Sequence, residues 1–302
     1  MTTFNFSRQR GFSLVEIALV LVIVGVALGA GLTALGPQLK NRMYSETLKT
    51  AQTANEAVLA FAMVNRRLPC PAVRFPAVAP AFDSRGQEAF CTNSDPANCG
   101  ALVFPPATSV GRVRGSCFVT ANPNRGLVPA ASLGLSGQNG NGLVIDAWAA
   151  PLRYFVPSTA SILGSPNNPT LTPLQNCAGG ITTCYPFNYV DGIRNRYYNP
   201  PTPPTTPISD VRVCNMIGAA NCAGAQEISN PAFAILSTGA NLNTAPPAIS
   251  ADETANVNND RVLVSRERTE ATAPAGFFDD VVVWTTIDQL IQKMQGNGAF
   301  PP

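Results

Sequence analysis

An apolar run near the N-terminus limits the fold of this chain more than any other feature. Residues 12–36 contain a single charged side chain, Glu16. As an α-helix this run would be about 37 Å long, which is enough to cross a bilayer. Arg8 and Arg10 precede it, and basic residues favour the cytoplasmic side of a membrane. The sequence therefore predicts one transmembrane helix that places the rest of the chain outside the cytoplasm.

Glu16 separates three interpretations of the apolar run. A cleaved secretory signal has an apolar core of about 7–15 residues, which is shorter than this run. A plain signal anchor fits the length but leaves a carboxylate in hydrocarbon without a partner, which is costly. A cut between Gly11 and Phe12 would keep the run attached and create an amino group one helical turn from Glu16. We favour this third interpretation because it gives the carboxylate a role.

The stretch GFSLVEIALVLVIVG, residues 11–25, resembles the class III signal peptide of type IV prepilins and type II secretion pseudopilins. In that family a membrane aspartyl peptidase cuts after the glycine and methylates the new N-terminus. Gly11, Phe12 and Glu16 match the motif, and Ser13 stands where threonine is more usual. The resemblance implies that Glu16 pairs with the N-terminal ammonium of a neighbouring subunit, because a buried carboxylate is tolerated when it is paired.

The helix is expected to continue to Arg67 as an amphipathic segment. Pro37 lacks a backbone N–H, so we expect the helix to kink or loosen there. The sequence LPCP, residues 68–71, ends the helix. An apolar stripe at three- and four-residue steps predicts packing against the C-terminal head. Its members are Leu39, Met43, Leu48, Ala51, Ala54, Val58, Phe61 and Ala62.

Composition bears mainly on the head, residues 68–302. The chain has 24 Gly and 27 Pro but only 13% charged residues, which is typical of loops and strands and not of a helical bundle. From Leu68 onward there are 13 basic and 15 acidic residues, so we expect no nucleic-acid partner. The chain has no histidine, the commonest general base and metal ligand, and we expect no enzymatic activity.

Short apolar segments predict the strands of the head. Residues 101–104 and 117–120 are two such segments, and residues 142–156 predict two strands joined at Ala-Ala-Pro. This last segment is similar to the D-x-W-G-x-P motif of major pseudopilins. Ala149 replaces the glycine of the motif, so we expect the tight turn to differ there. The matching residues are Asp146, Trp148, Pro151 and Tyr154.

The C-terminal segments extend the same resemblance. Residues 233–241 and 279–284 look like the last two strands of the family's sheet. Residues 286–294 predict a closing helix that has Ile287, Leu290, Ile291 and Met294 on one face. The resemblance therefore implies an α+β fold with a cleaved leader, residues 1–11. In this pilin-like fold a long N-terminal helix, residues 12–67, packs on the antiparallel sheet of the head.

All eight cysteines follow the apolar run. An even number of cysteines outside a membrane anchor indicates an oxidising compartment and disulfide bonds. Many connectivities are open; short separations favour Cys91–Cys99, Cys177–Cys184 and Cys214–Cys222, which leaves Cys70 with Cys117. The absence of histidine and of CxxC pairs argues against a metal cluster.

Calcium is the one candidate cofactor, because major pseudopilins carry a calcium loop just before their final strand. Five acidic residues near that place offer the hard oxygen ligands that calcium prefers. They are scattered along the sequence, so we expect solvated loop residues and no bound cofactor. The five are Asp252, Glu253, Asp260, Asp279 and Asp280.

These features predict a prepilin-like subunit of a type IV pilus or a type II secretion pseudopilus. It would wait in the bacterial inner membrane as a single-pass protein with its head in the periplasm, and then join the fibre. The size of the head suggests a minor or specialised subunit. Expected partners are the prepilin peptidase and N-methyltransferase, other pilin or pseudopilin subunits, and the inner-membrane assembly platform. The alternative is a membrane-anchored binding, adhesion or DNA-capture protein that keeps its leader and tolerates Glu16→Ala.

Overall fold

The computed structural model describes most of the N-terminal helical region and about half of the head. The described residues are 13–33, 35–65, 68–72, 86–91, 102–103, 126–135, 142–156, 211–216, 227–229, 231–241, 250–258, 260–270, 272–274 and 276–296. The chain divides into two compact units, Met1–Ser45 and Glu46–Pro302.

The first unit is helical. It contains α1 (Leu14–Thr33) and the beginning of α2 (Leu35–Asn65). Residue 34, between the two helices, lies outside the described residues, and Pro37 lies within α2. The part of the predicted helix 12–67 that the structure describes is helical over Leu14–Thr33 and Leu35–Asn65. Among the described residues, no helix combines the length and the apolarity needed to span a membrane.

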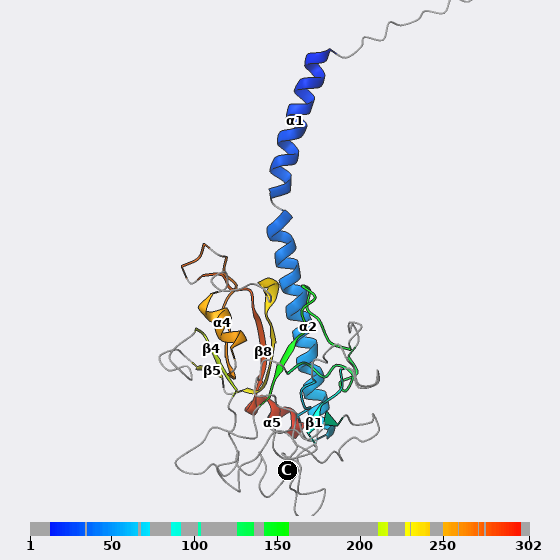
Figure 1. Ribbon diagram of the computed structural model, residues 1–302, viewed down its shortest axis with the longest axis vertical. Coiled ribbons are helices and arrows are strands. Elements are labelled where there is room, and N and C mark those ends of the chain that lie inside the picture. Colours follow the sequence, from blue (N-terminus) through cyan, green and yellow to red (C-terminus); the bar gives the residue numbers. More distant parts are fainter. Residues whose placement is uncertain are drawn as a thin grey trace, which may run out of the picture. The chain divides into compact units, whose positions relative to one another are not determined.

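A three-stranded antiparallel sheet forms the centre of the second unit (Figure 1). Its strand order is β3–β6–β8, and all seven residues of β6 are buried. A strand buried on both faces must be covered from both sides, which explains its apolar sequence PAFAILS. The strands are β3 (Arg153–Phe155), β6 (Pro231–Ser237) and β8 (Val281–Thr286).

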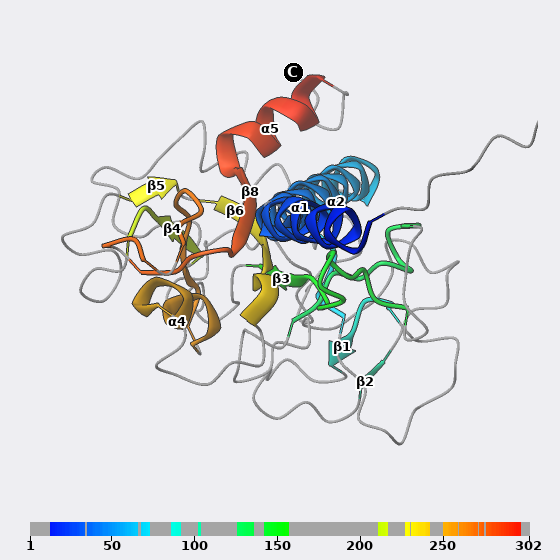
Figure 2. The same ribbon diagram turned by 90° about the horizontal axis from the view of Figure 1, so that it is seen from above.

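The C-terminal half of α2 packs beside this sheet (Figure 2). Ala51, Ala54, Val58 and Ala62 are fully buried, and the small alanines let the helix lie close to its neighbours. The Thr285 hydroxyl of β8 donates a hydrogen bond to Asn55 Oδ1 of α2, at 3.0 Å. The predicted stripe is thus confirmed over the second half of α2.

Leu39 departs from the predicted stripe. It lies in the first unit, and 59% of its surface is exposed. The expectation that Leu39 packs on the head concerns a contact between the two units and stays a prediction.

A second sheet corrects the prediction of a single antiparallel one. Its order is β5–β4–β7, and β4 pairs with β7 in parallel. Parallel pairing needs a long connection between the strands, and short-range turn signals do not predict it. These elements lie on the side of β6 and β8 away from β1 and β2 (Figures 1 and 2). The remaining elements are β1 (Phe90–Cys91), β2 (Leu102–Val103), β4 (Arg212–Cys214), β5 (Glu227–Ser229), η6 (Gly239–Asn241), α4 (Ala251–Val257), β7 (Val262–Val264) and α5 (Ile287–Gly296).

The two strands predicted near the C-terminus are present, but they begin and end at other residues than predicted. The strand expected at residues 233–241 stops at Ser237, because Gly239 adopts a left-handed conformation with φ +61°. The strand expected at residues 279–284 begins only at Val281, and the two aspartates before it turn their side chains into the protein interior. The expected strand at residues 117–120 lies outside the described residues.

The closing helix is confirmed as α5. Its four predicted apolar residues, Ile287, Leu290, Ile291 and Met294, are buried. They recur at three- and four-residue steps, so they lie along one face of the helix. The Thr286 hydroxyl accepts a hydrogen bond from the Gln289 N–H at 3.1 Å and caps its first turn.

Candidate functional sites

Glu16 lies in the first turn of α1. Its backbone N–H donates to both the side-chain and the backbone oxygen of Ser13, at 3.2 Å and 3.0 Å. Ser13 therefore caps the helix, and the Glu16 side chain is exposed close to the positive end of the helix dipole. Gly11 and Phe12 lie outside the described residues.

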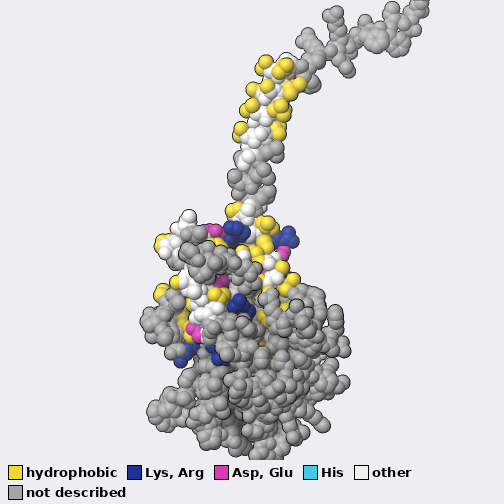
Figure 3. Space-filling view, in the orientation of Figure 1, with side chains coloured by type: hydrophobic (Ala, Val, Ile, Leu, Met, Phe, Trp, Pro, Cys, Tyr) yellow, Lys and Arg dark blue, Asp and Glu magenta, His cyan; other side chains and the backbone are white. Residues whose placement is uncertain are grey.

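The α1 helix carries its apolar side chains on the surface of the first unit. Figure 3 shows hydrophobic side chains over the visible face of this helix. Their exposed fractions run from 45% for Val24 to 86% for Leu14. Such a surface is costly in water, so it indicates contact with another apolar phase or molecule.

Asp146 organises the hairpin turn of residues 142–156. Its Oδ1 accepts hydrogen bonds from the backbone N–H groups of Trp148 and Ala150, at 2.9 Å and 2.8 Å. Its Oδ2 accepts one from the Ser237 hydroxyl of β6, at 2.6 Å. Burial raises the pKa of Asp146, and these three hydrogen bonds oppose that rise. The carboxylate therefore joins the turn to the central sheet.

The rest of the Asp-x-Trp motif is structural as well. Ala149 has φ 64°, so the alanine takes the left-handed conformation for which glycine is the usual residue. The N–H of Ala147 donates to the buried hydroxyl of Thr47 on α2, at 3.1 Å. Pro151 pairs with Ile145 across the turn, and Tyr154 packs edge-on against Phe233. The motif thus attaches the hairpin to α2 and to β6.

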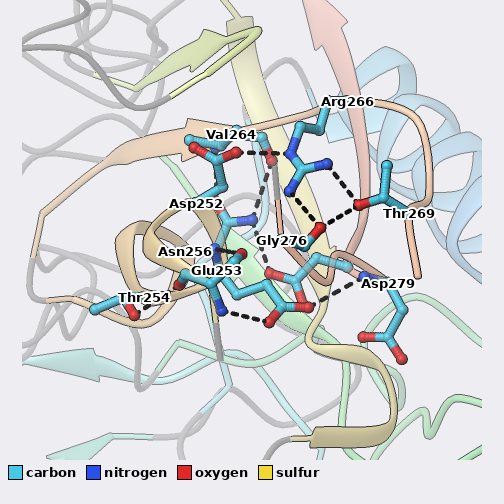
Figure 4. Close-up of polar contacts among 11 residues, drawn as sticks. Asp252, Glu253, Thr254, Asn256, Val264, Arg266, Thr269, Gly276 and Asp279 are labelled. Atoms are coloured by element: carbon cyan, nitrogen blue, oxygen red, sulfur yellow. Dashed lines mark hydrogen bonds and ion pairs between the residues drawn. The ribbon is translucent and has the colours of Figure 1, made fainter. Parts of the chain in front are cut away.

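The acidic residues before β8 are buried, and the expectation of a solvated loop is wrong for four of the five. Asp252, Glu253, Asp279 and Asp280 are between 2% and 8% exposed, and only Asp260 is exposed. Helix α4 is the reason. It brings its first turn next to the residues that precede β8, although the two segments are far apart in sequence (Figure 4).

Glu253, Asp279 and Asp280 form one cluster. One carboxylate oxygen of each lies within 4.8 Å of those of the other two. Glu253 Oε1 accepts a hydrogen bond from the Asp279 N–H at 3.1 Å, and Glu253 Oε2 accepts one from the Ser250 N–H at 3.2 Å. Asp279 Oδ2 accepts one from the Ala240 N–H at 3.0 Å.

Burial acts strongly on Asp280, the third member of this acidic cluster. Burial raises the pKa of Asp280 well above its usual range, and the charges of Glu253 and Asp279 add to the rise. A hydrogen bond from Asn256 and the more weakly acting charge of Arg153 oppose it. Asn256 Nδ2 donates to Asp280 Oδ2 at 2.8 Å, while Oδ1 is buried without a hydrogen-bond partner among the described residues.

Asp252 belongs to a different set of contacts. Its carboxylate forms a salt bridge with Arg266 at 2.6 Å. The guanidinium of Arg266 also lies 4.4 Å from the centre of the Phe278 ring and donates to the Thr269 hydroxyl at 2.8 Å. Figure 4 shows Arg266 between Asp252 and Thr269. Asp252 therefore holds the segment between β7 and β8 against the helix.

Asn256 is a residue of this site that the sequence did not single out. It is fully buried on α4, and its side chain bonds to both backbone groups of Val264 on β7, at 2.6 Å and 3.0 Å. Its Nδ2 also donates to Asp280 Oδ2. An asparagine in a helix carries no sequence signal for such a role, because both of its partners come from later segments of the chain.

The cysteines are described only in part. Cys70 and Cys214 are disulfide-bonded, and both are buried. The backbone N–H of Cys70 donates to the buried carboxylate of Glu88 at 2.6 Å, which fixes the start of the head. The proposed pairings stay predictions. Cys99, Cys117, Cys177, Cys184 and Cys222 lie outside the described residues, and Cys91 is described only as part of β1.

Comparison with known proteins gives one match. Residues 6–32 match the family model of the prokaryotic N-terminal methylation motif. No curated protein and no solved structure matches the chain. The match covers Gly11, Phe12 and Glu16, together with most of α1. The chain therefore carries the N-terminal methylation motif that is the signal motif of type IV prepilins.

Proposed function

We propose that this chain is a prepilin-like subunit that is cut after Gly11 and methylated on Phe12. It would then assemble through its N-terminal helix into a type IV pilus or a type II secretion pseudopilus. The match of residues 6–32 to the N-terminal methylation motif carries the proposal. The large head, residues 68–302, favours a minor or specialised subunit, and we assign it no enzymatic activity.

The surface of α1 supports assembly through this helix. Its exposed leucines, valines and isoleucines offer a large apolar area that neighbouring helices in a fibre would bury. Glu16 lies in the first turn, one turn from the amino group that cleavage at Phe12 would create. The ammonium of a neighbouring subunit would compensate the carboxylate when both leave water.

The proposed location before assembly is the bacterial inner membrane. Residues 12–36 would be the single membrane-spanning segment, and the head would lie in the periplasm. The disulfide bonds of Cys70 and Cys214 fit an oxidising compartment of this kind. The proposed partners are the prepilin peptidase and N-methyltransferase, other pilin or pseudopilin subunits, and the inner-membrane assembly platform.

Intact-mass measurement and N-terminal sequencing of the protein from its native membranes test the processing. We expect a chain that begins at Phe12 and is heavier by one methyl group. A chain that begins at Met1 would overturn the proposal and favour an anchored binding protein. A chain that begins beyond Leu32 would indicate an ordinary secreted protein.

A pair of glutamate variants tests the assembly role. Glu16→Ala should strongly reduce incorporation into sheared fibres while the protein still accumulates in membranes, because its carboxylate no longer compensates a neighbour's ammonium. Glu56→Ala removes an exposed carboxylate from α2 and is the matched control. Equal incorporation of both variants would show that Glu16 has no part in assembly.

A further inference from the structure

Ser13 is the residue that caps the N-terminal end of α1. The helix begins at Leu14, directly after it. The Ser13 carbonyl accepts a hydrogen bond from the Ile17 N–H at 3.2 Å, and the Ser13 hydroxyl accepts one from the Glu16 N–H at 3.2 Å. These two contacts define an N-cap residue. Ser13 therefore sets where the helix starts, and it follows Gly11 by two residues in the sequence.

The residues around Ser13 carry a helix start signal in the sequence itself. Ser13 and Glu16 have the spacing of a capping box, Ser-x-x-Glu. Phe12 and Ile17 are apolar residues at the two positions of a hydrophobic staple, directly before the cap and at the fourth helical position. The matched methylation motif includes all four residues. The motif thus also specifies the first residue of the helix.

The start of the helix decides whether the Gly11 carbonyl is engaged in a hydrogen bond. In an α-helix each N–H donates to the carbonyl four residues earlier, so a helix that included Gly11 would join this carbonyl to the Val15 N–H. Cleavage adds water to the Gly11 carbonyl carbon and breaks its bond to the Phe12 nitrogen. A carboxyl group remains on Gly11 and an amino group on Phe12. A helical turn would cover the groups that a peptidase must reach.

We propose that Ser13 is a positioning residue for this cleavage, because its cap at Leu14 keeps the bond between Gly11 and Phe12 out of the helix. The inference rests on the proposed function, since it concerns the cut after Gly11. Removing a serine N-cap shifts the balance between helix ends by about fivefold. Only chains whose helix starts after the bond are competent for cleavage, so the apparent rate follows their fraction.

Cleavage of the full chain in detergent by purified prepilin peptidase tests the role of the cap. Ser13→Ala should lower kcat/KM by about two- to fivefold. Ser13→Thr and Ser13→Asp supply other capping oxygens and should stay within about twofold of the wild-type value. Ser45→Ala removes a hydroxyl that donates to the Arg42 carbonyl within α2, and as the matched control it should be cleaved at the wild-type rate.

Two results of the cleavage assay would overturn the inference. If Ser13→Ala is cleaved as fast as the wild-type chain, the cap has no part in cleavage. If Ser13→Thr and Ser13→Asp are cleaved as slowly as Ser13→Ala, the peptidase recognises the serine itself. A peptidase that leaves the wild-type chain uncut would refute the proposed function, and the inference with it.

Amide hydrogen exchange at Val15 tests the cap without the peptidase. In a helix that begins at Leu14, the Val15 N–H lies in the first turn and has no carbonyl partner four residues earlier in the helix. Ser13→Ala should slow its exchange by about two- to fivefold in the full chain labelled with 15N-valine, because more chains then join it to Gly11. Val24, inside α1, is the internal reference. Unchanged exchange at Val15 would overturn the inference even if Ser13→Ala is cleaved slowly.

Discussion

Apolar side chains are usually buried and charged side chains are usually exposed, and the α1 helix and the head each depart from one half of this rule. The α1 helix exposes leucine, valine and isoleucine side chains, whereas the head buries Asp146, Asp252, Glu253, Asp279 and Asp280. Both arrangements are costly for an isolated chain, because apolar surface is disfavoured in water and carboxylates are disfavoured in the interior.

The α1 helix and the head differ in which groups offset these unfavourable free energies. The head supplies much of its own, since Asp146 accepts three hydrogen bonds and Asp252 forms a salt bridge with Arg266. The described part of the chain supplies little cover for α1, whose apolar residues from Leu14 to Val26 are exposed. The described part of the head thus stabilises its buried carboxylates with its own hydrogen bonds and ion pairs, whereas the apolar side chains of α1 are exposed on the surface of their unit.

The largest expected effect comes from placing a charge at a buried position of α2, with a charge at an exposed position of α1 as the control. Val58→Asp should lower the stability of the head by more than about 4 kcal/mol, because Val58 of α2 is fully buried. Val22→Asp, on α1 where Val22 is 66% exposed, should leave the thermal midpoint of the head unchanged. Near-UV circular dichroism of the full chain in detergent measures both. An equal loss for Val22→Asp would show that α1 packs against the head.

A pair of glycine substitutions tests how tightly the head holds its carboxylates. Gly239 and Gly134 both have positive φ, so alanine costs about 1–2 kcal/mol at either position. A Cβ at Gly239 would also collide with the carboxylate of Asp279, whereas at Gly134 it meets nothing within 4 Å. We expect Gly239→Ala to cost about 3 kcal/mol or more in urea denaturation. Equal costs would mean that Asp279 moves aside freely.

Ala149→Gly should stabilise the head. The alanine is held at φ 64°, and glycine relieves a strain of about 1 kcal/mol in that conformation. Ala147→Gly, two residues earlier in the same turn and without positive φ, should stabilise nothing. Urea denaturation of the two variants measures the difference. A loss of stability for Ala149→Gly would contradict the strain.

The smallest expected effect is a pH dependence at Asp146. Its pKa is raised in the folded chain, so its contribution to stability is full below about pH 4 and declines as the pH rises through the raised pKa. Asp146→Asn keeps an acceptor for the Trp148 and Ala150 N–H groups but does not titrate. The stability of the wild-type chain relative to this variant should therefore fall between about pH 4 and pH 7. Denaturation curves at both pH values measure it, and a relative rise would mean that the three hydrogen bonds outweigh burial.

The sequence alone determined the features that depend on neighbouring residues. The helical period placed the closing helix and the buried half of the α2 stripe, and the spacing of Gly11, Phe12 and Glu16 identified the methylation motif. The Asp146 turn was also recognisable, because its contacts to Trp148 and Ala150 span at most four residues. Such features follow from local geometry, and local geometry repeats wherever the residue pattern does.

Only the tertiary structure decided the parallel pairing of β4 with β7 and the burial of the acidic cluster. Glu253 and Asp279 are 26 residues apart, and they meet because α4 folds back on the start of β8. Scattered carboxylates look alike in a sequence whether they lie in water or in a core. Their surroundings come from segments far along the chain, and the free energy that brings those segments together is shared over many contacts.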